Sequence, residues 1–238
     1  MTTAQILTIL EHGEINLSGR FLWGSNSTFL VSVNHEGQAL PAVYKPSQGE
    51  TPLWDFPRGS LAQREVAAYL LSRALGWDLA PPTLLRQSAP SGPGSLQLFV
   101  NADPQHHFFT FSITEKQRLR PVAVFDLLAN NADRKGGHIL MRPDGSICLI
   151  DHGLCFHAEP KLRTVIWDFA GEPVPEALLK DVGRFLEQFR EGQSRYADLA
   201  RLLLPEELTA LRLRAETLLH NPVFPGPGPG RPYPWPLV

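Results

Sequence analysis

Two aspartates lie on either side of a predicted β-hairpin in the middle of the chain. Asp133 lies in "NNADRKGGH" and Asp151 lies in "LIDHG", each at the edge of an apolar run. Between them, residues 139–150 place strand-forming side chains on both sides of a Pro-Asp-Gly turn, which predicts a hairpin. A hairpin returns the chain to its starting end, so we expect the two carboxylates to converge. Carboxylate oxygens are ligands that Mg²⁺ prefers, although a lone aspartate in a turn is usually a local cap.

A lysine ends a predicted strand in the first half of the chain. Lys45 follows the mostly apolar residues of "LPAVY", and an exposed lysine is the ordinary alternative for such a position. Phosphoryl transfer requires a cation near the phosphates, carboxylates for a metal ion, and an acceptor for the proton of the nucleophile. Lys45, Asp133 and Asp151 together supply those three requirements.

The first half of the chain contains the elements that must position the lysine. Residues 15–45 carry strand-type side chains separated by the turns "GSNS" and "NHEG", which predicts an antiparallel β-meander. A helix is predicted over residues 61–75, because Ser60 and Gln63 form a capping-box signature and Gly76 supplies a stop.

The second half of the chain is predicted to be mostly helical. A short amphipathic helix begins near residue 121, and three further helices follow residue 175. These patterns predict a β-rich lobe with one helix over residues 1–100, a helical lobe over residues 101–220, and a tail over residues 221–238.

The tail is rich in proline and glycine. Proline fixes φ and has no backbone donor, so we expect the tail to be extended or polyproline-like. Disorder is one alternative for the tail, and anchoring of its aromatic side chains on the domain is the other. The candidate anchors are Phe224, Tyr233 and Trp235.

Composition excludes several classes of protein. The 238 residues carry a formal net charge of -2, so no global basic field would recruit nucleic acid. No run of about 18 apolar residues is present, and the N-terminal residues lack the pattern of a secretory signal. Cys148 and Cys155 do not form a metal-binding or redox pair by spacing. We therefore expect a cytoplasmic globular protein that does not insert into a membrane.

The segments "VYKP", "REVAAYL", "NNADRKGGH" and "IDHG" resemble the motifs of the atypical branch of the protein-kinase-like fold. This branch includes phosphoinositide 3- and 4-kinase-like enzymes, HipA-type kinases and secretory-pathway kinases. The chain is most similar to a bacterial family described as phosphatidylinositol 3- and 4-kinase related. The resemblance implies an α+β, two-lobed kinase-like fold, with an N-terminal antiparallel β-lobe containing one helix and a mostly helical C-terminal lobe.

The same resemblance assigns roles to residues of the second lobe. Asp133 corresponds to the catalytic base or nucleophile-orienting acid, and Lys135 to a donor toward the transferring phosphoryl group. Asp151 takes the place of the metal-binding aspartate of the Asp-Phe-Gly motif. His138 stands where such kinases commonly have an asparagine that holds a second metal. Imidazole prefers softer ions than Mg²⁺, so His138 is a candidate Mn²⁺ ligand, a hydrogen-bond partner of the base, or a packing residue.

Lys45 corresponds to the lysine that contacts the α- and β-phosphates of ATP in such folds. Glu65 is its expected ion-pair partner, and Glu50 is a rival. The backbone N–H groups of a turn containing Ser25 and Asn26 could cradle phosphate.

The segment "QLFV" falls in the linker between the predicted lobes. There Phe99 and Val100 could supply apolar contacts and main-chain hydrogen bonds to adenine, and a buried strand is the alternative interpretation.

The leading interpretation is an ATP-dependent phosphotransferase that uses Mg²⁺ or Mn²⁺ and acts on a protein hydroxyl or a small metabolite. A lipid acceptor is not favoured, because the chain has no polybasic run or basic amphipathic helix. Two alternatives remain open. One is a nucleotide-binding regulatory module without turnover, and the other is a nucleotidyl transferase that passes AMP to its acceptor.

Overall fold

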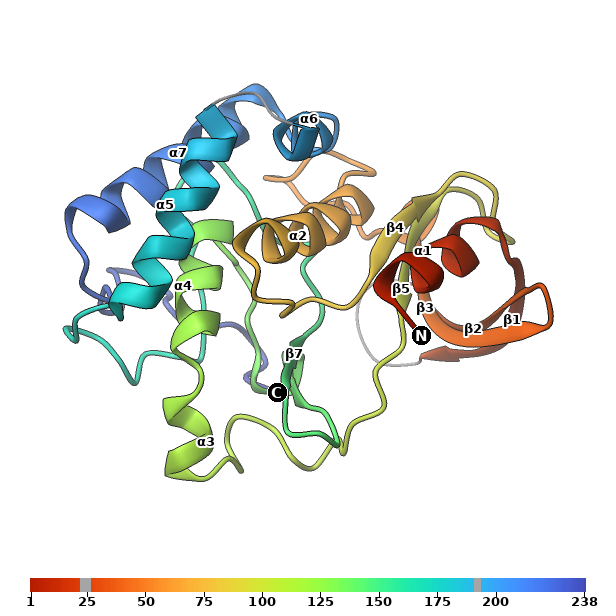
Figure 1. Ribbon diagram of the computed structural model, residues 1–238, viewed down its shortest axis with the longest axis horizontal. Coiled ribbons are helices and arrows are strands. Elements are labelled where there is room, and N and C mark those ends of the chain that lie inside the picture. Colours follow the sequence, from red (N-terminus) through yellow and green to blue (C-terminus); the bar gives the residue numbers. More distant parts are fainter. Residues whose placement is uncertain (22–26, 191–193) are drawn as a thin grey trace.

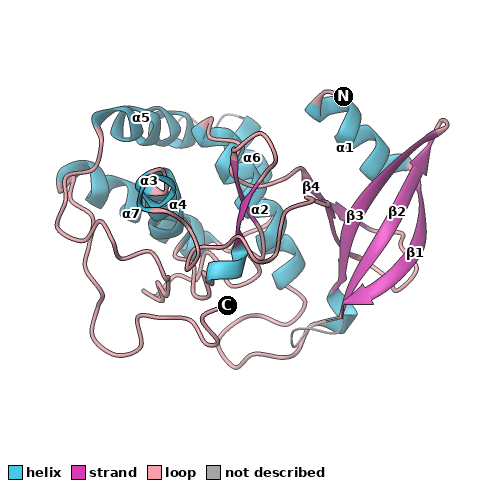
Figure 2. Cartoon of the chain, turned by 90° about the horizontal axis from the view of Figure 1, so that it is seen from below, coloured by secondary structure: helices cyan, strands magenta, loops and turns pink. Residues whose placement is uncertain are grey.

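The computed structural model describes residues 1–21, 27–190 and 194–238 of the chain (Figure 1). The predicted Ser25 and Asn26 contacts lie outside the described residues. In the described part, a sheet and one helix form one end of the molecule and most of the helices form the other (Figure 2). This is the α+β architecture expected from the sequence, but the helix at the sheet end, Thr3–His12, was not predicted.

An antiparallel five-stranded sheet forms the N-terminal end of the described chain, in the order β1-β2-β3-β5-β4. The predicted meander is confirmed. Its second turn is a tight two-residue connection in which Glu36 and Gly37 both have positive φ, the conformation that suits a right-twisted hairpin. The strands are β1 (Glu14–Phe21), β2 (Thr28–His35), β3 (Gln38–Pro46), β4 (Thr83–Arg86) and β5 (Gly94–Leu98).

Helix α1 (Thr3–His12) covers one face of this sheet. Ile9 and Leu10 of the helix are buried against the sheet residues Val33, Tyr44 and Leu96. Because alternate side chains of a strand point to opposite faces, the neighbours of Tyr44 and Leu96 face away from this small core. Those neighbours include Lys45 and Gln97, which face the larger lobe.

Helix α2 (Leu61–Leu75) forms where expected and ends at Gly76, which is left-handed. The predicted capping box is wrong, however. Ser60 has αR backbone angles and its hydroxyl donates to the Pro57 carbonyl, so it does not cap the helix. The carboxylate of Glu50 accepts from the Ala62 N–H at 3.1 Å instead, a contact across a loop that local spacing does not reveal. Glu50 is therefore engaged at the helix start rather than with Lys45.

The larger lobe is built around a single apolar core that α2 shares with the C-terminal helices. The hairpin predicted over residues 139–150 is present, with Ile139 opposite Leu149 and Met141 opposite Ile147. The elements of this lobe are α3 (Ile113–Gln117), α4 (Arg120–Ala129), β6 (Ile139–Met141), β7 (Ile147–Leu149), α5 (Glu176–Arg190), α6 (Ser194–Ala200) and α7 (Pro205–His220). Short 3₁₀ turns, η1 (Ser47–Gly49) and η2 (Gly136–His138), precede α2 and β6.

The proline-rich tail is extended, as expected, and lies along the larger lobe. Phe224 is buried in the core, whereas Tyr233 and Trp235 are exposed, so only the first of the three candidate anchors is buried. Backbone bonds hold the rest of the tail: Thr164 N–H donates to the Pro232 carbonyl, and Gly136 N–H donates to the Leu237 carbonyl.

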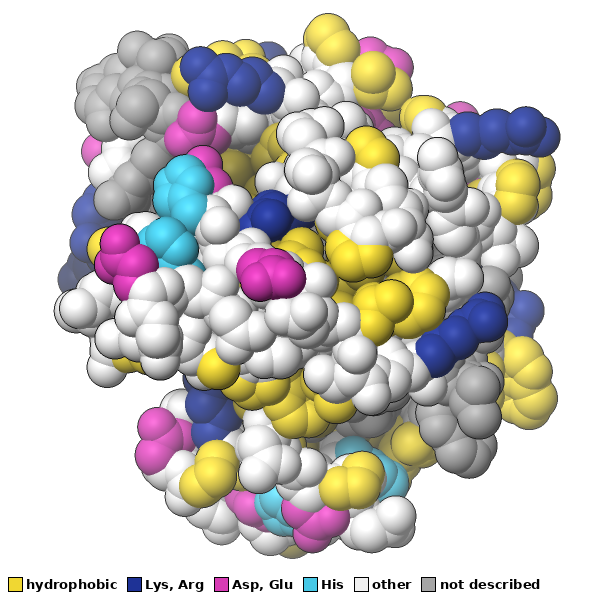
Figure 3. Space-filling view, turned by 90° about the vertical axis from the view of Figure 1, so that its right-hand side faces the viewer, with side chains coloured by type: hydrophobic (Ala, Val, Ile, Leu, Met, Phe, Trp, Pro, Cys, Tyr) yellow, Lys and Arg dark blue, Asp and Glu magenta, His cyan; other side chains and the backbone are white. Residues whose placement is uncertain are grey.

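Within the described ranges, no helix is both long enough and apolar enough to cross a membrane. On the face shown in Figure 3, most lysine and arginine side chains are scattered among hydrophobic, acidic and uncharged groups.

A buried ion pair joins α2 to the C-terminal helices. Arg64 of α2 is almost inaccessible, and its guanidinium donates to the Glu207 carboxylate of α7 and to the Cys155 carbonyl. A buried charge that loses its counter-ion is strongly destabilising, whereas replacing both partners by apolar groups is often nearly neutral. The pair therefore ties the orientation of α2 to the larger lobe.

Glu207→Leu should lower the free energy of unfolding by about 3–5 kcal/mol, because it leaves Arg64 buried and unpaired. The double variant Arg64→Met, Glu207→Leu should recover part of that loss in urea titrations. Asp198→Ala, which removes an exposed ion pair with Arg201, should change stability by less than about 0.5 kcal/mol. A double variant less stable than Glu207→Leu would contradict this role of the pair.

Candidate active site

A pocket of about 380 Å³ lies between the sheet and the larger lobe. It is lined from the sheet side by β3, β5 and the start of α2, and from the other side by the loop that contains Asp133 and Lys135 and by the β6–β7 hairpin. Every described candidate residue lines it: Lys45, Glu65, Phe99, Val100, Asp133, Lys135, His138 and Asp151. The residues that the sequence places far apart are therefore brought to one cavity.

Lys45 is at the centre of the charged part of the pocket. Its ammonium group forms a close ion pair with Glu65 of α2 and donates to Asp151 Oδ1 at 2.9 Å. Glu65 is itself buried, and its second oxygen accepts from the His152 N–H at 2.9 Å. The structure thus shows the expected Lys45–Glu65 pair, and it adds a contact between the lysine and Asp151.

The charges of this cluster stabilise one another. Burial on its own would lower the pKa of Lys45, but the carboxylates of Asp151 and Glu65 outweigh it and raise that pKa above its ordinary value. The Lys45 charge holds the pKa of Asp151 well below its usual range. Burial raises the pKa of Glu65, but Lys45 and His152 more than compensate and bring it to about 2. All three groups are therefore charged near neutral pH.

Asp133 faces the same pocket from the loop before η2. Its carboxylate lies 3.0 Å from Lys135 Nζ, and its backbone N–H donates to Asn131 Oδ1 at 2.9 Å. Burial raises the pKa of Asp133, and the neighbouring Lys135 charge opposes that effect. A raised carboxylate pKa makes the group a better proton acceptor than an exposed aspartate.

His138 bridges the two aspartates. Its Nδ1 lies 3.1 Å from the Asp133 carbonyl oxygen, and its Nε2 lies 3.3 Å from Asp151 Oδ2. Burial lowers the pKa of His138 to about 4, so the ring is neutral near pH 7. The Nδ1–H tautomer donates to the Asp133 carbonyl and leaves the Nε2 lone pair facing the pocket, whereas the Nε2–H tautomer donates to Asp151 Oδ2 and accepts from the Lys135 N–H at 3.5 Å.

Asp151 has a left-handed backbone conformation, with φ of 60°. Such a conformation is costly for a residue with a Cβ and is typical of functional turns. The next residue, His152, is fully buried and its ring packs edge-on against Phe125 at 5.6 Å between centroids. The buried histidine anchors the turn, and the strained residue before it directs its carboxylate into the pocket.

A buried ion pair that sequence reasoning missed holds the two acidic loops together. Arg134 donates to both oxygens of Asp126, with Nε to Oδ2 at 3.0 Å and Nη2 to Oδ1 at 2.9 Å. The same guanidinium donates to the Ile150 carbonyl at 3.0 Å. Asp126 is a charged residue in the otherwise apolar stretch "PVAVFDLLA", and that anomaly was the available signal. Arg134 follows Asp133 and Ile150 precedes Asp151, so the contacts of Arg134 hold the two aspartates close together.

Phe99 and Val100 line the pocket, but one of their backbone donors is already engaged. The Phe99 N–H donates to the Pro41 carbonyl at 3.0 Å, so it is not a main-chain donor for a bound base. The pocket also has apolar lining that the sequence did not identify: Val43 from the sheet, and Leu140 and Ile150 from the hairpin.

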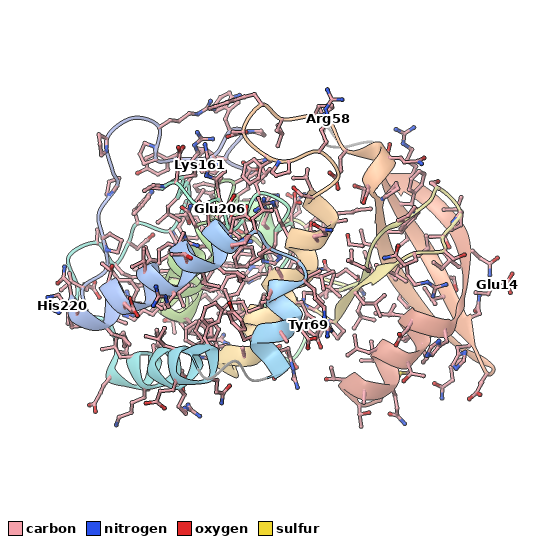
Figure 4. The ribbon with its side chains drawn as sticks, turned by 90° about the horizontal axis from the view of Figure 1, so that it is seen from above. Glu14, Arg58, Tyr69, Lys161, Glu206 and His220 are labelled. Atoms are coloured by element: carbon pink, nitrogen blue, oxygen red, sulfur yellow. The ribbon has the colours of Figure 1, made fainter. Side chains whose placement is uncertain are left out.

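A segment that follows Asp151 contacts the loop before α2. Lys161 Nζ lies 2.9 Å from Asp55 and 5.2 Å from the ring centroid of the exposed Trp54. Arg58 and Lys161 lie toward the same edge of the molecule in Figure 4. The lysine therefore belongs to a contact between the two lobes rather than to a free basic surface.

Comparison with known proteins identifies the family. No protein-family profile matches the chain. Protein Rv2133c of Mycobacterium tuberculosis is 41% identical over 96% of this chain and 94% of its own length. The chain belongs to the Rv2133c family. A rice phosphatidylinositol 4-kinase gamma 4 is 29% identical over 63% of this chain, and the match covers 33% of the plant protein. The Rv2133c family is thus related to the phosphatidylinositol kinases, as the motifs indicated.

Solved structures give the same result for the fold. A Golgi casein kinase with Mn/ADP bound superposes with a TM-score of 0.59 at 16% identity, covering 92% of this chain and 74% of that one. The Helicobacter pylori proinflammatory kinase CtkA superposes with a TM-score of 0.53 at 12% identity, covering 90% of this chain and 94% of that one. The Rv2133c-family chain has the two-lobed kinase-like fold, and the predicted fold class is confirmed.

Acid should lower the free energy of unfolding of the wild-type protein, in part because Glu65 becomes protonated. Its pKa is about 2 in the folded protein, below the ordinary value of 4.5. The stabilisation is therefore fully present above pH 4.5 and is lost as the pH falls toward 2. Urea titrations between pH 3 and pH 7 should show a smaller loss of stability in Glu65→Gln, and the exposed control Glu11→Gln should follow the wild type. Parallel curves for Glu65→Gln and wild type would contradict the assignment.

Proposed function

We propose that this protein is an ATP- and divalent-metal-dependent phosphotransferase that acts on a protein hydroxyl or a small metabolite. One observation carries the proposal: Lys45, Asp133 and Asp151 face a single pocket, with the lysine ammonium 2.9 Å from the Asp151 carboxylate. Kinase-like relatives and a neighbouring structure that contains Mn/ADP support it. Phosphoryl transfer relies on positioning and charge rather than on covalent chemistry by the protein, and this cluster supplies both.

Lys45 is the proposed ligand of the α- and β-phosphates. Glu65 holds the ammonium group in place through their ion pair. The glutamate is buried, so its carboxylate stays in a fixed position. The lysine stays charged, since its pKa is raised. A bound triphosphate would therefore meet a cation held in one place, without first having to order a flexible side chain.

Asp133 is the proposed base. As the acceptor oxygen forms its bond to the γ-phosphorus, the bond from that phosphorus to the ADP oxygen breaks, and the hydroxyl proton passes to Asp133. Its pKa is raised by burial, which favours accepting a proton in that step. Lys135, 3.0 Å from Asp133, is placed to donate to the transferring phosphoryl group.

Asp151 and His138 are the proposed metal ligands. In the Nδ1–H tautomer of a neutral His138, the Nε2 lone pair faces Asp151 Oδ2 at 3.3 Å, an arrangement that a cation between the two would make favourable. Metal-binding histidines commonly donate their other N–H to a carbonyl, and in this tautomer His138 donates to the Asp133 carbonyl, 3.1 Å away. The donor set therefore fits a divalent ion, which when bound would neutralise charge on the β- and γ-phosphates.

A nitrogen ligand favours Mn²⁺ over Mg²⁺. His138→Asn should therefore weaken Mn²⁺ binding in the presence of ADP by about 10-fold or more while changing Mg²⁺ binding less. Electron paramagnetic resonance of free Mn²⁺, with Mg²⁺ as competitor, measures both affinities without turnover. The exposed His12→Asn should behave as wild type, and an unchanged Mn²⁺ to Mg²⁺ ratio in His138→Asn would show that the imidazole is not a ligand.

The acceptor is proposed from charge and sequence rather than from the names of relatives. The plant relatives are phosphatidylinositol kinases, but this chain has no polybasic run that would hold it on anionic lipid. A protein hydroxyl or a small metabolite is therefore the proposed acceptor, in the cytoplasm, where the free and buried Cys148 and Cys155 would stay reduced. Phosphate incorporation from labelled ATP in fractionated lysate would test this, and exclusive labelling of lipid would contradict it.

The direct test of the activity is ADP release with Mg²⁺ or Mn²⁺, measured beside ATP affinity. Asp133→Asn should reduce turnover by at least about 100-fold and leave ATP affinity within a few fold, because only the proton acceptor is lost. Asp151→Asn should remove the metal dependence of ATP binding.

The mass of the product separates the alternatives. Addition of phosphate supports the proposed kinase, whereas addition of AMP would indicate a nucleotidyl transferase. ATP binding without turnover under either metal would make the protein a regulatory nucleotide-binding module.

A further inference from the structure

Gln97 of β5 lies at the apolar end of the pocket. In the sheet register, Gln97 is opposite Val43 and Ser95 is opposite Lys45. Alternate residues of a strand share a face, so the Gln97 carboxamide is on the cleft side with Val43 and Lys45. It lines the pocket and is 6% exposed. A buried amide at this position needs a partner for each polar atom.

Thr83 fixes the orientation of that carboxamide. The Thr83 hydroxyl lies 2.8 Å from the Pro81 carbonyl and 2.9 Å from Gln97 Nε2. A carbonyl only accepts, so the hydroxyl proton is donated to Pro81, and the hydroxyl oxygen can only accept from Gln97. The NH₂ group of Gln97 must therefore face Thr83. Thr83 is also buried, so water does not replace this bond.

The Gln97 oxygen is consequently the atom offered to the pocket. No described residue donates a hydrogen bond to Gln97 Oε1. This oxygen is also absent from the fully enclosed side-chain atoms that lack a partner, so it is open to the pocket. Apolar side chains from both lobes also line the pocket: Val43 from β3, and Leu140 and Ile150 from the hairpin. A flat ring bound between these side chains would direct its edge toward Gln97 Oε1. That oxygen stays an acceptor, because Thr83 prevents the amide from flipping.

We propose that Gln97 determines nucleobase specificity, accepting a hydrogen bond from the exocyclic amine of a 6-aminopurine. This inference rests on the proposed nucleotide-binding function. A 6-oxopurine would set its carbonyl oxygen against the Gln97 oxygen, which leaves two buried acceptors facing each other without a proton. Sites built around a hydrogen bond reject a ligand that lacks the matching group more strongly than apolar sites reject one of the wrong size. Thr83 is the positioning residue, since it prevents the amide from flipping.

The experiment measures affinity for non-hydrolysable ATP and GTP analogues with Mn²⁺ present, by calorimetry. Wild type should bind the ATP analogue at least about 10-fold more tightly than the GTP analogue. Purine riboside triphosphate, which has only hydrogen at position 6, should fall between them. Gln97→Met, of similar size but without the amide, should reduce the ATP to GTP ratio to less than about 3-fold.

Two substitutions at Thr83 test the orientation separately. Thr83→Ser keeps the hydroxyl and should keep the wild-type ratio. Thr83→Val removes the acceptor, so the amide can turn its NH₂ group toward the pocket, and affinity for the GTP analogue should rise relative to that for ATP. Because only the ratio is compared, a general loss of stability does not imitate this result, and the Thr83 pair decides the question if Gln97→Met fails to fold.

Three results would overturn the inference. They are equal affinity of wild type for the two analogues, a wild-type ratio in Gln97→Met, and the same ratio in Thr83→Val and Thr83→Ser. Each of these leaves nucleotide binding itself intact. Failure of wild type to bind either analogue would instead remove the proposed function together with this inference.

Discussion

The rest of the site depends on the ion pairs that the Lys45 ammonium group forms with Glu65 and Asp151. The ammonium group lies between the lobes, and it contacts Glu65 from one element and Asp151 from another. Removing charges from water is costly unless each has a partner, so none of these groups is stable in its place without the others. The sheet, α2 and the turn after β7 are thereby held in one arrangement, which is also the arrangement that a metal nucleotide would require.

A second buried pair carries the same constraint into the larger lobe. Arg134 and Asp126 are both inaccessible, and Arg134 also holds the Ile150 carbonyl next to Asp151. Asp133 and Asp151, the proposed base and metal ligand, are therefore positioned by residues that do not themselves face the pocket. Arg64 acts similarly for α2 through Glu207. The buried ion pairs Arg134–Asp126 and Arg64–Glu207 do not line the pocket, but they fix the positions of the elements that carry the pocket side chains.

Local sequence patterns predicted most of the elements, and motif resemblance predicted which side chains would meet. The Pro-Asp-Gly turn was enough to predict that Asp133 and Asp151 converge, because a hairpin has few alternatives. The cap of α2 was predicted wrongly, since Glu50 and not Ser60 accepts from the first turn, across a loop. The Arg134–Asp126 and Thr83–Gln97 contacts were also missed. Each depends on tertiary packing between elements, which neither hydrophobic period nor turn composition encodes.

The most direct test of the account is a crystal structure with a non-hydrolysable ATP analogue and Mn²⁺, with the metal located by its anomalous scattering. The account predicts Mn²⁺ bonded to an Asp151 oxygen and to His138 Nε2 at about 2.0–2.3 Å. It also predicts a phosphate oxygen on Lys45 and the γ-phosphate facing Asp133. Metal and nucleotide bound outside this pocket, or the triphosphate bound with Asp133 facing away from it, would contradict the central claim.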